Sequence, residues 1–202
     1  MDPAQTAVLS IGFQNDYFAA DGVLRKVVEE GVVGGNILPN TLDLIRGLWN
    51  SPVHMVSTPI QFTEGYSELQ DPVGILRAIR DVGAFRAGTR GGATIPELEA
   101  LGERIMPVPG KRGLNAFSNT DLDHYLRARG VRDVVLAGVV TAVCIDSIGR
   151  SAFEQGYRVT VLSDCTAGRS ELEQRFYLDQ VFPLYAGVMD HHQLLAALRA
   201  PQ

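Results

Sequence analysis

Short, unbroken apolar segments that alternate with helical patterns constrain the fold of this chain most strongly. The segments are rich in Val, Ile and Leu and lack polar alternation, which is typical of strands covered on both faces in a parallel sheet. They are AVLSI (7–11), VHMVST (53–58), RIMPV (104–108), DVVLAGVV (133–140), RVTVLS (158–163) and YAGVM (185–189). Apolar residues at helical spacing fill the intervals between most of them. The sequence therefore predicts a three-layer α/β domain with a mostly parallel sheet.

Residues that favour helix starts and stops mark the helix boundaries. Pro39 suits the first turn of a helix over NTLDLIRGLWN. Asn119 or Thr120 is a candidate N-cap for NTDLDHYLRARG, and Gly130 is a candidate stop. Gly156 ends AVCIDSIGRSAFEQG in the same way, and two further helical patterns, RSELEQRFYLDQVF and HHQLLAALRA, follow it.

The length of 202 residues suits a single domain that spans 1–202. The segment 61–103 is less regular than the rest, with the glycine-rich stretch GAFRAGTRGGAT and one short helical pattern, GILRAIRD. We interpret 61–103 as an insertion that borders the functional site.

Charge and hydropathy narrow the expected partners and location. The formal net charge is −5 and the arginines are scattered, so no basic face for nucleic acid is expected. No apolar run reaches the roughly 20 residues that a membrane span needs, and MDPAQTAVL lacks the pattern of a secretion signal. We predict a cytoplasmic protein whose partner is a small-molecule substrate, with no nucleic acid and no membrane.

Three stretches follow predicted strands, where open parallel sheets bind their ligands: 12–17, Lys111 and 139–144. Cys144 is predicted in the first turn of a helix, where free N–H groups and the helix dipole favour a thiolate and an oxyanion. The alternative is a small buried hydrophobe, which is what most free cysteines are. Cys165 lacks a helix directly after it, so we interpret it as structural.

Lys111 lies between a predicted strand and a capped helix, in VPGKRGLNAFSNTDLDHYL. In a closed pocket its ammonium group would favour a thiolate or stabilise an oxyanion. The alternative is an ordinary solvated lysine, and the residue alone leaves both interpretations open.

Together these stretches resemble the isochorismatase-like cysteine hydrolase family, which includes nicotinamidases and N-carbamoylsarcosine amidases. The similarity rests on AVLSIGFQNDYF, on GKRGLNAFSNTDL followed by GVVTAVC at a helix start, and on AGVMDHHQLLAAL. The resemblance implies a Rossmann-like sheet of six parallel strands and a triad of Asp, Lys and Cys. It assigns Cys144 as the nucleophile and Lys111 as its charged partner.

The resemblance also implies an oxyanion hole and an oligomer. It places a cis peptide between Val139 and Val140, which would aim the N–H groups of Val140 and Cys144 at the oxyanion. Members of this family commonly form dimers or tetramers, so a homodimer or homotetramer is expected.

The third triad position departs from the family pattern. The family's first strand ends in ID-x-Q-x-D-F, with the first Asp as general base, whereas this chain reads IGFQNDYF. Gly12 therefore occupies the place of the base, and Asp16 matches the second, non-triad Asp. General acid–base catalysis is worth roughly 10²–10⁴-fold, so this position decides what chemistry is possible.

Several accounts of Gly12 stay open. A water, Asp16 or a substrate carboxylate takes over the proton transfer, or the glycine makes room for a larger substrate with a good leaving group. Otherwise the chain has lost hydrolysis and keeps a binding or interaction role, or the glycine is a substitution that inactivates this particular chain.

Pocket, metal and cofactor expectations follow from the remaining loop residues. Phe13, Gln14, Tyr17 and Gln61 are expected to line the substrate pocket. Four histidines without H-x-x-x-H spacing predict no bound metal, with His54 in the core and His191 and His192 solvated. No dinucleotide or phosphate-loop motif is present, so no cofactor is expected.

Two functions are consistent with these residues. The first is a cofactor-independent cysteine hydrolase that cleaves an amide or other C–N or acyl bond of a small molecule through a Cys144 thioester. The second is a catalytically impaired relative that binds a small molecule or a partner.

Overall fold

The computed structural model describes residues 1–33 and 36–199, and it contains the predicted parallel sheet. The strands run in the order β3-β2-β1-β4-β5-β6, and every neighbouring pair is parallel. Their bounds are β1 (Thr6–Ile11), β2 (His54–Thr58), β3 (Met106–Pro107), β4 (Asp133–Val139), β5 (Arg158–Ala167) and β6 (Gly187–Met189). The predicted three-layer α/β fold is confirmed, and each strand overlaps one of the apolar segments.

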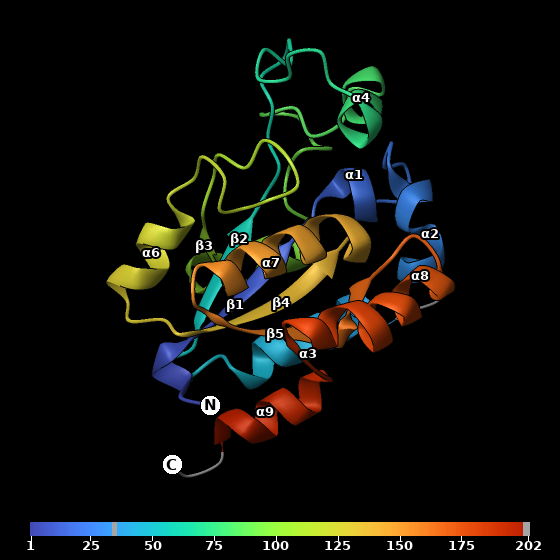
Figure 1. Cartoon of the computed structure of the whole chain (residues 1–202). Coiled ribbons are helices and arrows are strands. Elements are labelled where there is room, and N and C mark those ends of the chain that lie inside the picture. The colour runs from blue at the N-terminus through green and yellow to red at the C-terminus, as the bar shows by residue number, and fades with distance from the viewer. Residues whose placement is uncertain (34–35, 200–202) are drawn as a thin grey trace.

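Helices cover both faces of the sheet (Figure 1). The α-helices are α1 (Asn15–Phe18), α2 (Arg25–Val33), α3 (Ile37–Gly47), α4 (Gly74–Asp81), α5 (Pro96–Glu99), α6 (Leu122–Ala128), α7 (Asp146–Glu154), α8 (Glu171–Phe176) and α9 (His191–Arg199). Short 3-10 turns are η1 (Pro3–Gln5), η2 (Gly102–Arg104) and η5 (Phe182–Leu184), and single π-helical segments are η3 (Thr141–Ile145) and η4 (Tyr177–Val181). No helix among the described residues is long and apolar enough to cross a membrane.

The core sits where the strands are buried on both faces. Every residue of β1 and β4 is buried, which explains why their sequences show no polar alternation. α3 and α7 both contact β5, and α9 packs against α3. The chain crosses from β1 to β2 on one side and from β4 to β5 on the other, so the strand order reverses between β1 and β4. Open parallel sheets bind their ligands at the carboxyl ends of the strands beside such a reversal.

Two helix starts differ from the sequence prediction. α3 begins at Ile37, so Pro39 is its third residue. α6 begins at Leu122 with Asp121 at the N-cap position, although Thr120 Oγ1 accepts a hydrogen bond from the Leu122 N–H at 3.2 Å. Single-sequence signals commonly miss helix ends by a residue or two.

The irregular segment 61–103 carries α4 and α5 and rises above the carboxyl end of the sheet (Figure 1). Residues just after β1 anchor it. The Gln14 amide nitrogen donates to the carbonyls of Ile60 and Gly92 at 2.8 and 2.7 Å, and the Gln14 amide oxygen accepts from the Ile60 N–H at 2.9 Å. Asn15 donates to the Arg90 carbonyl at 2.9 Å. No local pattern predicts these contacts, because they join positions 46 to 78 residues apart.

Candidate active site

Cys144 lies in the turn that leads from β4 into α7. The chain leaves the strand at Val139, the peptide between Val139 and Val140 is cis, and η3 then carries Cys144 directly before α7. The thiol is 1% exposed. Both the helix-start placement and the cis peptide agree with what the sequence and the resemblance implied.

Lys111 reaches this turn from the segment that follows β3. The residue is completely buried, and its Nζ donates a hydrogen bond to Cys144 Sγ at 3.4 Å. Its carbonyl accepts a hydrogen bond from the Gln61 N–H at 3.2 Å, which holds the Lys111 backbone against the loop that follows β2. Among the described residues, no carboxylate lies within ion-pairing distance of Nζ. The solvated-lysine alternative does not fit this burial.

Gly12 lies at the end of β1, beside the cis peptide. Its φ is +72°, in the left-handed region that side chains other than glycine rarely adopt. A Cβ atom built there would lie 2.7 Å from the Val139 carbonyl oxygen and 3.1 Å from Val139 Cγ2. The backbone therefore leaves no space for a side chain at this position without a shift of Gly12 or Val139.

Asp16 has a structural role. It is 6% exposed, and its Oδ2 accepts a hydrogen bond from the Phe85 N–H at 2.6 Å. Burial raises the pKa of Asp16, and the Phe85 hydrogen bond and the nearby Arg86 only partly offset this effect. Asp16 thus holds the 85–91 loop, which makes a swing toward the thiol costly.

The residues predicted to line the substrate pocket differ in their surroundings. Phe13 is 3% exposed and stacks on Phe18 with ring centroids 5.0 Å apart. Gln14 is also buried, with its amide committed to the segment 60–92 as described above. Both therefore contribute packing and anchoring in this structure.

Tyr17 is buried at 1% exposure, and its ring lies against that of Phe85 with centroids 5.0 Å apart. Its hydroxyl makes no hydrogen bond to the described part of the chain. Burial, and then the charges of Cys144 and Asp16, raise the pKa of Tyr17. The phenol therefore stays protonated at neutral pH.

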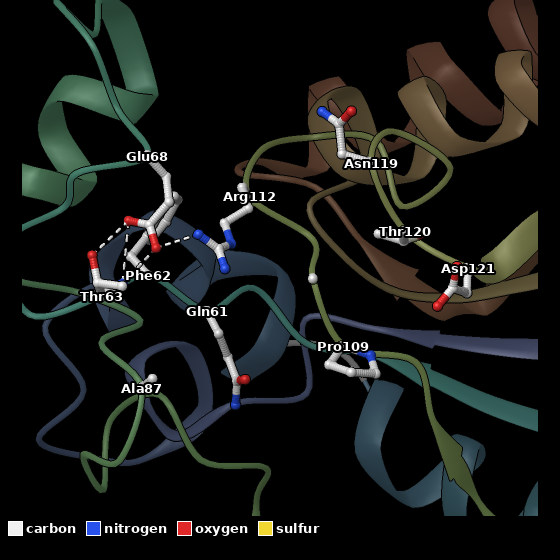
Figure 2. Close-up of a pocket in the computed structure, with 11 residues that line it drawn as sticks. Gln61, Phe62, Thr63, Glu68, Ala87, Pro109, Arg112, Asn119, Thr120 and Asp121 are labelled. Carbon is white, nitrogen blue, oxygen red and sulfur yellow. Dashed lines mark hydrogen bonds and ion pairs between the residues drawn. The ribbon is translucent and has the colours of Figure 1, made fainter.

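Gln61 lines an open cavity of about 460 Å³ that borders the Lys111 segment (Figure 2). Gly110 and Arg112, the two neighbours of Lys111 in the sequence, also line it. Arg112 forms an ion pair with Glu68, whose carboxylate also accepts hydrogen bonds from the N–H and hydroxyl of Thr63. The Arg112–Glu68 pair is not predictable from the sequence, since nothing in either local pattern links the two positions.

A second set of side chains stabilises the turn between β4 and α7 that carries Cys144. Thr141 donates from Oγ1 to Gln174 Oε1 at 2.5 Å. The amide nitrogen of Gln174 donates to the carbonyl and the hydroxyl of Thr166, each at 3.1 Å. The turn that holds the thiol is therefore tied to α8 and to the end of β5, a linkage that the sequence did not reveal.

Comparison with known proteins shows the family and agrees with this fold. The chain matches the Isochorismatase domain family over residues 6–193. Its structure is similar to a cysteine hydrolase from Pseudomonas syringae pv. phaseolicola, with a TM-score of 0.84 and 22% identity over 98% of this chain and 94% of that one. It is also similar to an isochorismatase-like hydrolase from Alkaliphilus metalliredigens, with a TM-score of 0.75 and 27% identity over 96% and 98% of the two chains.

Among curated relatives, the ureidoacrylate amidohydrolase RutB of Methylobacterium radiotolerans is 37% identical over 109 residues, which is 50% of this chain and 42% of the relative. An uncharacterized isochorismatase family protein of Escherichia coli O157:H7, YecD, is 30% identical over 53% of this chain and 52% of its own. The matched part of the chain thus spans about half the length, or less, of these curated relatives.

Proposed function

The chain belongs to the isochorismatase family of hydrolases, and from this premise we propose that it is a cofactor-independent cysteine hydrolase of a small molecule. The bond cleaved is an amide or another C–N or acyl bond. Cys144 is the nucleophile, and Lys111 is its charged partner. The single observation that carries the proposal is the contact of 3.4 Å between Lys111 Nζ and Cys144 Sγ inside the protein.

Burial makes this contact chemically effective. A positive charge beside a thiol favours the thiolate, which is the nucleophilic form. The interaction is stronger where water is excluded, because the local dielectric constant is lower. With no carboxylate on Nζ among the described residues, the thiol sulfur is the acceptor that Lys111 has.

Lys111 also supplies the proton transfer that Gly12 cannot. In the first step the Cys144 thiolate attacks the carbonyl carbon, the C–S bond forms, and an ammonium proton of Lys111 passes to the leaving nitrogen as the C–N bond breaks. In the second step water attacks the thioester, and the neutral Lys111 amine takes a water proton. The carboxylic acid leaves, and the ammonium–thiolate pair returns.

The oxyanion formed in both steps has donors at the same turn. We propose the N–H groups of Val140 and Cys144 for this role, at the start of η3 and α7. The proposed substrate cavity is the one lined by Gln61 and Arg112.

One observation favours the second candidate function, a binding protein without hydrolysis. The Gly12 backbone is shaped for glycine and not for an acid, so the chain is not one substitution away from the triad that the family resemblance implies. A protein that keeps the pocket and the buried pair for ligand binding would show this same geometry.

Hydrolysis of candidate amides separates the two functions. The purified full chain is incubated with a panel of small primary amides and N-carbamoyl compounds, including ureidoacrylate, and ammonia release is measured. We expect turnover of at least one compound and its loss in Cys144→Ser. A matched control is Cys165→Ser, which removes the other cysteine and is expected to retain turnover. Stoichiometric ligand binding without turnover, unchanged in Cys144→Ser, would favour the binding protein.

A further inference from the structure

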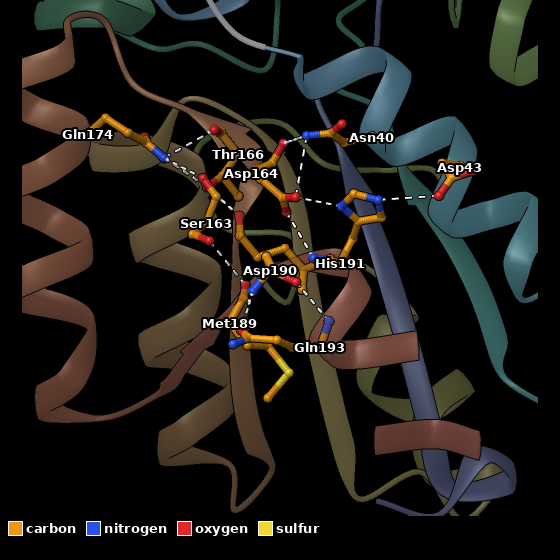
Figure 3. Close-up of polar contacts among 11 residues, drawn as sticks. Asn40, Asp43, Ser163, Asp164, Thr166, Gln174, Met189, Asp190, His191 and Gln193 are labelled. Carbon is orange, nitrogen blue, oxygen red and sulfur yellow. Dashed lines mark hydrogen bonds and ion pairs between the residues drawn. The ribbon is translucent and has the colours of Figure 1, made fainter. Parts of the chain in front are cut away.

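A second polar cluster lies at the start of α9, apart from the Lys111–Cys144 pair (Figure 3). Its centre is His191, which is 4% exposed and is the first residue of α9, separated from β6 by Asp190. The sequence predicted a solvated histidine here, and that prediction is wrong. The reason is that α9 packs back onto α3 and β5 and so covers the first residue of the helix.

Asp164 fixes the orientation of the His191 ring. Asp164 Oδ2 lies 2.5 Å from Nδ1 of His191, and Asp164 Oδ1 accepts the His191 backbone N–H at 3.0 Å. A carboxylate can only accept, so Nδ1 carries the hydrogen and the lone pair of a neutral ring is on Nε2. Histidines that bind metal ions almost always donate the hydrogen of their other ring nitrogen to a carboxylate, a backbone carbonyl or a water, and Asp164 supplies such an acceptor here.

Nε2 of His191 faces a second carboxylate. Asp43, on α3, places Oδ2 at 3.3 Å from Nε2, and its side chain is 58% exposed. Two acceptors at this distance attract each other only when a proton or another cation lies between them. Two ligand atoms bound to one tetrahedral zinc ion at about 2.0–2.2 Å would lie about 3.3–3.5 Å apart, which matches the distance seen.

His192 completes a set of three ligands. Its ring lies against that of His191, with centroids 3.9 Å apart, and the side chain is exposed. One ligand atom from each of Asp43, His191 and His192 lies within 4.8 Å of the others. This set differs from the H-x-x-x-H pattern, because its two histidines are adjacent and its carboxylate comes from a different helix.

We propose that Asp43, His191 and His192 bind a divalent transition-metal ion of the zinc class, with Asp164 as the orienting carboxylate. Two imidazoles and one carboxylate suit zinc, cobalt and nickel, whereas magnesium and calcium prefer oxygen ligands throughout. The ion bridges α3 and α9 across the end of the sheet and stabilises the docking of the last helix. This role is independent of the proposed hydrolase activity.

A neighbouring arrangement of Asp164, Cys165 and His191 fits less well. Cys165 is completely buried, and burial together with the Asp164 charge raises the pKa of its thiol. In addition, the nitrogen of His191 that faces Asp164 already carries the hydrogen. The proposal therefore uses the outer face of His191, which leads to solvent through Asp43 and His192.

Metal titration of the full chain tests the site. The protein is freed of metal with a chelator and titrated with ZnCl₂ by calorimetry and with CoCl₂ by absorption spectroscopy. We expect one ion per chain, visible cobalt bands of a tetrahedral or five-coordinate N/O site without thiolate charge transfer, and a higher Tm in zinc. His192→Ala and Asp43→Asn, both at exposed positions, are expected to weaken binding by about tenfold or more.

Matched controls decide whether the binding belongs to this site. His124→Ala removes an exposed histidine of α6 and is expected to leave the zinc affinity unchanged. Absence of stoichiometric binding would overturn the proposal, as would equal affinity in the wild type, His192→Ala and Asp43→Asn. A thiolate charge-transfer band that Cys165→Ser abolishes would also overturn it, because the ion would then occupy the inner arrangement.

Discussion

At the scale of single residues, the candidate site contrasts a long side chain at Lys111 with no side chain at Gly12. Lys111 is a long charged side chain that is completely buried, with a thiol as its hydrogen-bond acceptor. Gly12 has no side chain, and its conformation and the nearby Val139 carbonyl prevent one from fitting. The proposed mechanism follows from both facts. Because Gly12 cannot transfer a proton, Lys111 is the residue that transfers it.

Replacing Gly12 tests the steric part of this account. Both Gly12→Ala and Gly12→Asp place a Cβ in the left-handed region and against the Val139 carbonyl oxygen. We expect each to lower the free energy of unfolding by about 1–3 kcal/mol, the typical cost of such backbone strain, as measured by urea denaturation. Alanine serves as the control, because it has the Cβ without the carboxylate. A Gly12→Asp protein as stable as the wild type, with faster amide hydrolysis, would contradict the account.

The buried thiol of Cys165 is expected to make the free energy of unfolding fall as pH rises in the alkaline range. Its pKa is raised above the ordinary value of 9.0, chiefly by burial, so above that pH the unfolded chain loses a proton that the folded chain keeps. Stability from this group is therefore lost as pH rises, by about 1.4 kcal/mol per pH unit. Urea unfolding at pH 9 and 10 should show a shallower decline in Cys165→Ala than in the wild type. Equal slopes would be evidence against the predicted burial effect.

At the scale of elements, the loop after β1 joins the sheet to the irregular segment 61–103. The Gln14 side chain makes three hydrogen bonds to backbone groups of Ile60 and Gly92, all in the interior. These bonds hold the segment over the carboxyl end of the sheet, next to the Lys111 backbone.

Replacing Gln14 should release that segment. In Gln14→Leu the backbone groups of Ile60 and Gly92 lose their partners, and each buried unsatisfied group costs about 1–3 kcal/mol. We expect a marked loss of unfolding free energy and faster hydrogen exchange in the segment 85–94. Gln61→Ala is the matched control, because the Gln61 side chain makes no hydrogen bond to the described part of the chain. Equal effects of the two substitutions would count against an anchoring role for Gln14.

The elements were predicted from the sequence more completely than the contacts among them. All six strands lie at the apolar segments, because strands buried on both faces must be apolar throughout. Cys144 was placed at a helix start by a local pattern of the same kind. Gln14 and His191 were assigned differently from what the structure shows, because their partners are distant in sequence and no local pattern encodes them.

At the scale of the whole molecule, apolar side chains gather on α8. Leu172 and Phe176 lie one helical turn apart and are 81% and 55% exposed. Exposed large apolar side chains that share a helix face are typical of protein interaction surfaces. This observation supports the proposal of a homodimer or homotetramer.

Light scattering tests this proposal. We expect a mass of two or four times 21.9 kDa for the wild type and a smaller assembly for Leu172→Asp. Val73→Asp is the control, since Val73 is 73% exposed next to α4 and far from α8 in the sequence. A monomeric wild type would refute the proposal of self-association, and an assembly that Leu172→Asp leaves intact would place the contact elsewhere.

The most direct measurement of the central claim is the rate at which iodoacetamide alkylates Cys144, compared in the wild type and in Lys111→Met. Peptide mass spectrometry reads both cysteines in the same chain. Cys165 is as buried as Cys144, but burial and the Asp164 charge raise the pKa of its thiol, so it serves as the internal reference. At pH 6–7 we predict rapid, stoichiometric labelling of Cys144 in the wild type, labelling slowed about tenfold or more in Lys111→Met, and slow labelling of Cys165 in both. If Cys144 instead reacts no faster than Cys165, or equally fast without Lys111, then Lys111 does not activate the Cys144 thiol.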